Sequence, residues 1–151
     1  MNELILMAHV LMGVLCVVAT VWVFADALNA SEANRARIRI ISRGAALAMW
    51  LSFVIGGYWY VSLYPADKAI ILKGPWPFAH NLFMETKEHL VILLLLLATY
   101  LPIAAAGNLA RSRDARSLVL WVAGLMVLLA LTIEGEGGLI AMGVKVALLA
   151  K

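Results

Sequence analysis

The sequence has few cysteines and few charges, and both shortages restrict what the protein can be. The one cysteine, Cys16, lies in an apolar run, so no intramolecular disulfide can form, and there is no Cys-x-x-Cys-His motif for covalent haem attachment. Only 14% of the 151 residues are charged. The sequence also lacks a phosphate-binding glycine loop, a nucleotide fingerprint and a nucleophile placed beside a base, so catalysis has little support.

Apolar residues dominate the chain instead. They make up 64% of it, and the mean hydropathy is +0.95, far above the range of soluble globular proteins. We therefore expect an integral membrane protein in contact with the lipid bilayer. The net charge of +3 and the isoelectric point near 9.2 are compatible with a nucleic-acid partner, but the basic residues flank apolar segments, as membrane topology requires. No nucleic-acid binding is expected.

Four apolar runs predict the fold. They lie at about 4–28, 44–64, 78–105 and 118–133. The four runs are interpreted as crossings of a hydrocarbon core of about 30 Å. The first run is too long for the apolar region of a signal peptide and follows no basic segment, so we interpret it as a retained helix. The prediction is an all-α, integral membrane four-helix transmembrane bundle forming a single domain over 1–151.

A glycine-rich segment, Glu134-Gly135-Glu136-Gly137-Gly138, follows the fourth run. A straight helix from Leu118 to Ala150 would be about 50 Å long at 1.5 Å per residue, which exceeds one crossing. We therefore predict a break at these glycines. After it we predict a short C-terminal interfacial helix at 139–150, with Lys145 and Lys151 reaching for water.

The arginines predict the orientation. All seven follow the first and third runs, so the positive-inside rule assigns those segments to the cytoplasm. Both termini, the glycine-rich break and the loop at 65–77 are then extracytoplasmic. The prolines and glycine of this loop argue against a continuous helix, and we expect it to fold back onto the membrane surface as a lid. The expected location is the bacterial inner (plasma) membrane.

Ionisable residues converge on the outer half of the predicted bundle. In the third run Glu85 and His89 are four residues apart and Glu88 lies within about 60° of Glu85, so the three share one helix face, whereas Lys87 points away. Such groups cost about 2.5–3.5 kcal/mol each at the bilayer centre, so they usually face the bundle interior and serve a function. The converging residues are His9, His80, Glu85, Glu88, His89, Glu134 and Glu136.

The first functional hypothesis is a b-type haem held between helices. His9 and His89 are at similar depth and would be its axial ligands, and His80 is a further cofactor-binding candidate. The protein would then transfer electrons between the membrane and an extracytoplasmic redox protein. The analogy with four-helix membrane cytochromes is architectural, because no family motif matches residue by residue.

The second hypothesis is a transition-metal site for Fe, Cu or Zn that serves redox chemistry or metal uptake. A second Glu-x-x-His motif, typical of four-helix proteins with two metals, is absent from the sequence. The candidate ligands are His9, Glu85, Glu88, His89, Glu134 and Glu136.

The third hypothesis needs no cofactor. The glycine-rich segment leaves backbone groups that are tolerated at membrane depth only where they line a cavity or contact protein. Glu134 and Glu136 within it would then form a polar ion-coupling site, or a docking site for a further membrane subunit, at the outer face.

Overall fold

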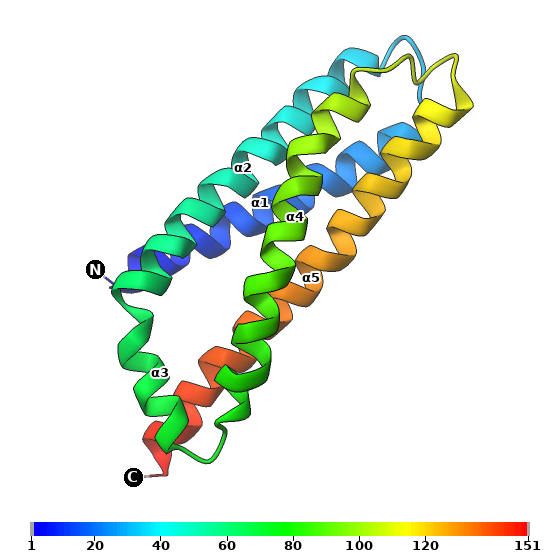
Figure 1. Ribbon diagram of the computed structural model, residues 1–151. Helices are drawn as coiled ribbons and strands as arrows, with labels where there is room; N and C mark the ends of the chain where they lie inside the picture. The colour runs from blue at the N-terminus through cyan, green and yellow to red at the C-terminus, as the bar shows by residue number, and fades with distance from the viewer. Residues whose placement is uncertain (1, 151) are drawn as a thin grey trace.

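The structure is a computed structural model that describes residues 2–150, with side chains for residues 3–150. The expectation for Lys151 lies outside this range. The helices are α1 (Asn2–Leu28), α2 (Arg35–Ser62), α3 (Tyr64–Lys73), the π-helix η1 (Ala79–Met84), α4 (Glu85–Ala105) and α5 (Arg113–Leu149). α1, α2, α4 and α5 form an elongated bundle (Figure 1). The loop between α1 and α2 and the loop between α4 and α5 lie at the same end of it.

Four helical segments are long and apolar enough to cross a membrane, namely Glu3–Leu28, Arg35–Ser62, Ala79–Ala105 and Arg113–Leu149. The prediction of an all-helical chain with four potential crossings is confirmed. Large apolar side chains cover the outside of the bundle, among them Leu4, Val61 and Trp121. An apolar surface of this extent is typical of helices that contact lipid.

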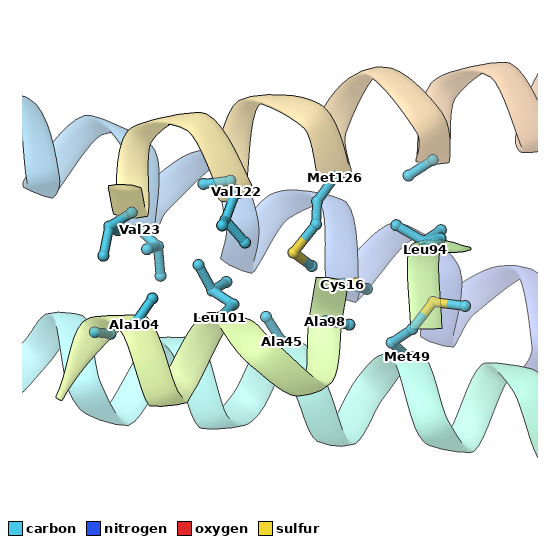
Figure 2. Close-up of a cluster of buried hydrophobic side chains, with 14 of the residues drawn as sticks. Cys16, Val23, Ala45, Met49, Leu94, Ala98, Leu101, Ala104, Val122 and Met126 are labelled. Atoms are coloured by element: carbon cyan, nitrogen blue, oxygen red, sulfur yellow. The ribbon is translucent and has the colours of Figure 1, made fainter. Parts of the chain in front are cut away.

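Small side chains let the four long helices approach closely. Ala45 on α2 and Ala98 on α4 are fully buried and lie near Cys16 of α1 and Met126 of α5 (Figure 2). In a membrane an apolar side chain gains little by leaving lipid for protein, so helix association depends on close contact. Small residues at the helix contacts allow the backbones to approach closely. Cys16 is a small buried apolar residue in this bundle core.

The predicted break in the last helix is wrong. α5 runs without interruption from Arg113 to Leu149, 37 residues or about 55 Å at 1.5 Å per residue. The separate interfacial helix predicted at 139–150 is its final part. Glycine weakens a helix by about 1 kcal/mol but does not end one by itself. Within the predicted break Gly137 lies under the Lys87 ammonium group, and further along α5 Gly143 is buried against Ala79, where an added Cβ atom would lie 2.6 Å from the alanine Cβ.

The predicted loop at 65–77 is mostly helix. Pro65 stands in the first turn of α3, where the missing N–H group would have no helical partner in any case. The segment does fold back, but onto the end of α5 (Figure 1). A second core is formed there by Tyr64, Ile71, Ala79, Met84 and Ile140.

The arginine-rich end is also more helical than predicted, since α2 begins at Arg35. Arg37 donates two hydrogen bonds of 2.7 Å to the Asp26 carboxylate. Arg39 donates to the carbonyl of Ala105 at the end of α4, a group without a helical partner. Cations at a helix C-terminus stabilise it, so Arg37 and Arg39 stabilise the ends of α1 and α4.

Candidate functional site

His9 lies between α1 and α2, at the end of the bundle opposite the arginines. Its Nδ1 atom is 2.9 Å from the carbonyl oxygen of Ser52, and the Ser52 hydroxyl donates to the His9 carbonyl at 3.1 Å. The ring packs on Gly56, where a Cβ atom would lie 2.6 Å from Nδ1. Because Nδ1 donates to a carbonyl, Nε2 is the nitrogen left for a proton, a water molecule or a metal.

Glu134 of α5 reaches across to α1. Its carboxylate occupies the space that a side chain at Gly13 would fill. A cavity of about 30 Å³ lies beside it, with His9, Ser52 and Lys87 also in its walls. This is room for about two water molecules, and the polar wall provides partners for them.

Lys87 is the cation of this cluster. Its ammonium group lies over Gly137 and interacts electrostatically with Glu134 and Glu136. Glu136 is only 7% exposed, and its Oε2 atom has no hydrogen-bond partner within the described chain. Within residues 2–150 no ion pair of 4.0 Å or less joins Lys87 to either carboxylate. A buried carboxylate without a partner is energetically costly, so this group is the most unusual feature of the site.

A second polar group lies under α3. The Tyr64 hydroxyl is 3.0 Å from Nδ1 of His80, and Nε2 of His80 is 3.6 Å from a Glu85 oxygen. Burial and the neighbouring negative charges raise the pKa of Tyr64, so the phenol keeps its proton and donates to His80. His80 lies in η1, and short π-helical segments frequently mark functional sites.

Tyr60 connects this group to Glu88. The Tyr60 ring stacks on Tyr64 at 5.5 Å, and its hydroxyl lies beside the Glu88 carboxylate. Glu88 is partly buried, and its Oε1 atom has no hydrogen-bond partner among the residues that the structure describes. The end of the bundle opposite the arginines therefore holds two neighbouring polar groups, one around Lys87 and one around His80.

The predicted inward face of the third run is only partly correct. Glu88 is partly buried, but Glu85 and His89 are exposed, and Nδ1 of His89 is 2.6 Å from the Glu85 carbonyl of its own helix. Lys87, expected to point away, lines the cavity. Helical spacing shows which residues share a face but not where that face points. In the structure α4 buries an apolar face that includes Leu94, Ala98 and Leu101, and in this rotation Lys87 lines the cavity beside Glu134.

Sequence reasoning missed several residues of the site. Ser52 is one polar residue in an apolar run, and Tyr64 follows Tyr58, Trp59 and Tyr60, a composition typical of the membrane interface. A signal for Lys87 was present: Glu134 and Glu136 need a cation, and Lys87 is the one lysine within the apolar run of another helix.

The residues proposed for a cofactor are not gathered around one space. Among the described residues no group of three or more His, Cys, Asp or Glu side chains is placed to hold a metal ion. The cavity beside His9, about 30 Å³, is small against the 300–1,000 Å³ or so of typical ligand sites, and His89 faces outward. His9 and His89 thus do not form a haem pocket in this arrangement. Haem and metal binding stay predictions.

No family model, no curated protein and no solved structure matches the chain. The chemistry must therefore be argued from the cluster itself. A buried carboxylate, a lysine on a second helix and a cavity large enough for water can take up, hold and release a proton.

Proposed function

We propose that the protein is an integral membrane protein with a proton-coupled site, formed by Lys87, Glu134 and Glu136, at the extracytoplasmic end of its helix bundle. The observation that carries the proposal is the Glu136 carboxylate, which is buried with one oxygen unpartnered while Lys87 lies nearby on another helix. Ionisable groups in this setting commonly mark proton or ion pathways.

The cluster is stable in two forms. Either the carboxylate and the amine are both neutral, or both are charged and in contact, because an isolated buried charge is disfavoured. Proton binding therefore changes the force between Lys87 of α4 and Glu136 of α5. The charge of the site is in this way coupled to the packing of two membrane-crossing helices.

Access to the site is from one side. The cavity and the His9 ring lie on the outer side of Cys16, and from Cys16 toward the arginine-rich end the core is formed mainly by apolar side chains such as Val23 and Leu101. The buried hydroxyls there, of Thr20 and Ser42, donate to carbonyls of their own helices. A site of this kind exchanges protons with the extracytoplasmic side and does not form a continuous path. The orientation, with both termini outside a bacterial inner membrane, is part of the proposal and follows from the arginines.

Infrared difference spectroscopy tests the proposal directly. The purified protein in lipid is titrated with acid and base while the C=O band of protonated carboxyl groups is followed. We expect a band that titrates in the parent protein, is lost in Glu136→Gln and shifts in Lys87→Met. Glu32→Gln, an exposed carboxylate at the other end, is the control and retains the band. A band that is the same in all variants would rule the site out.

Haem b electron transfer is the second candidate. His9 favours it, because its Nδ1 atom donates to the Ser52 carbonyl, and histidines that bind a metal usually donate their other ring N–H to such a group. The test is a visible spectrum of the detergent-purified protein, oxidised and reduced, with metal analysis for Fe, Cu and Zn. A Soret band lost in His9→Ala supports the haem and an extracytoplasmic redox partner. A featureless spectrum excludes it.

A further inference from the structure

An apolar groove of about 540 Å³ lies between α1 and α5, far from the polar cluster. Val21 and Phe24 form one wall, and Ser117 and Trp121 lie on the other. Gly124 leaves the groove open, because an added Cβ atom would be in ordinary contact with the Phe24 ring at 3.6 Å and a longer side chain would fill the space.

The groove has the length of one leaflet. It follows α5 from Ser117 to Leu128, which is about 16 Å at 1.5 Å per residue. Half of a hydrocarbon core of about 30 Å is nearly the same distance. It begins beside the arginine-rich end, where the polar surface of the membrane would lie, and ends near the bilayer centre. One extended acyl chain fits this path.

The polar end of the groove is positively charged. Arg113 begins α5 four residues before Ser117, so the two lie on the same side of the helix. Arg113 is exposed and forms no ion pair with the described residues. Asp114 beside it is the one acidic residue of the first turn. Ser112 caps the Ala115 N–H group, and the N–H groups of Arg113 and Asp114 add to the attraction for an anion. Seven arginines face three carboxylates at this end of the molecule.

We propose that this groove is a binding site for an anionic phospholipid, with one acyl chain between α1 and α5 and the phosphate against Arg113. The apolar walls, the length of one leaflet and the charge at the polar end all suit this ligand. The site is independent of the proton-coupled cluster, so each proposal can fail without the other.

The test uses phosphatidylglycerol and phosphatidylcholine with the same brominated acyl chains, which quench tryptophan fluorescence on contact. The full chain carries Trp22→Phe, which removes the tryptophan next to Val21 in the groove wall, and Trp121, 69% exposed at the groove, reports above the signal of Trp50, Trp59 and Trp76. Trp121→Phe measures the background. We expect phosphatidylglycerol to quench at about fivefold lower concentration than phosphatidylcholine. This ratio is the gain in affinity expected from one arginine beside an anionic headgroup.

Three variants separate the acyl-chain site from the charge. Gly124→Leu fills the groove and removes the tight component of quenching, whereas Gly57→Leu, at a position open on all sides, keeps it. Arg113→Gln makes the two lipids equal. Equal quenching by both lipids in the parent protein overturns the proposal. So does a dimer in which Trp121 is shielded from both, because the groove would then be covered by a second copy of the chain.

Discussion

At the scale of single residues, the structure shows how an apolar bundle accommodates ionisable side chains. Three of them lie against a glycine of a neighbouring helix, where the missing side chain provides the space. Close approach of this kind both excludes lipid and brings the polar group to a backbone or a partner. The pairs are Glu134 on Gly13, His9 on Gly56 and Lys87 on Gly137.

Gly56 offers the sharpest test of this arrangement. The His9 ring against it is held by Ser52 and cannot swing away without losing that hydrogen bond. We expect Gly56→Ala to lower the free energy of unfolding by about 1–3 kcal/mol, as overpacking does. Gly57→Ala, whose Cβ meets nothing within 4 Å, should raise it by about 0.5–1 kcal/mol through helix propensity. Thermal unfolding in detergent measures both, and equal effects would contradict the close packing.

The interaction of Lys87 with Glu136 is measurable as a coupling energy. Lys87→Met leaves the α5 carboxylates without their cation, and Glu136→Gln leaves Lys87 with Glu134 alone. We expect the double variant to lose less unfolding free energy than the sum of the losses in the two single variants, by about 0.5–3 kcal/mol. Unfolding of the four proteins gives the cycle. Strict additivity would show that the two groups do not interact.

The sequence predicted the composition of the polar site better than its geometry. Glu134, Glu136 and His9 could be placed at one end because depth follows from residue number along apolar helices. The rotation of each helix about its axis could not be predicted. The third run carries ionisable residues on opposite faces, with Lys87 on one and Glu85 and His89 on the other. The partners on α5 decide between these faces, and no single-helix pattern contains that information.

At the scale of elements, α3 and the end of α5 were the least predictable. Proline at the start of a helix and glycine within one both resemble breaks, and tertiary packing overrides each. The long apolar runs were predictable because crossing a bilayer requires about 20 apolar residues in succession. The secondary structure of short apolar segments such as Ile70-Ile71-Leu72 depends on the element that packs against them.

Gly143 distinguishes a packed α5 end from a free interfacial helix. In the structure its backbone lies against Ala79. Gly143→Ala should therefore destabilise the tip of the molecule by about 1–3 kcal/mol, whereas Gly135→Ala, at an open position, should stabilise it slightly. Hydrogen exchange of α3 amides reports the effect. Unchanged exchange in Gly143→Ala would favour a free interfacial helix.

Asp67 gives α3 a pH dependence. Burial raises the pKa of this carboxyl in the folded chain, so the folded state binds its proton more tightly than the unfolded state does. The stability from this group is present at acid pH and falls as the pH rises above the ordinary range of aspartate. Asp67→Asn should flatten that fall and make the protein modestly more stable at neutral pH. Unfolding midpoints measured across the acid range show whether the slope depends on Asp67.

At the scale of the whole molecule, α5 is much longer than one crossing. Its 37 residues span about 55 Å against a core of about 30 Å, so its last third lies beyond the apolar region of the bundle, where α3 and η1 cover it. The polar cluster at Glu134 and Glu136 lies where the bundle meets this last third. The bundle proper is thus capped at one end by a smaller helical unit.

Labelling of introduced cysteines tests both this cap and the orientation. In a Cys16→Ala background, Ala141→Cys near the exposed end of α5 should react in intact cells with a maleimide that does not cross membranes. Arg111→Cys, at the opposite end, should react only after the cells are opened. The reverse pattern would invert the topology, and protection of Ala141→Cys in both preparations would place the cap within the membrane.

The buried face of α5 passes from one core to the other at Glu136. Ile133 belongs to the bundle core, Ile140 belongs to the core under α3, and Glu136 lies between them. Two separately packed regions form separate units of local unfolding. A sub-global opening of the smaller unit, with the bundle intact, would hydrate the carboxylate at their junction. Fluctuations of the cap, and not of the membrane helices, would then set how fast this group meets water.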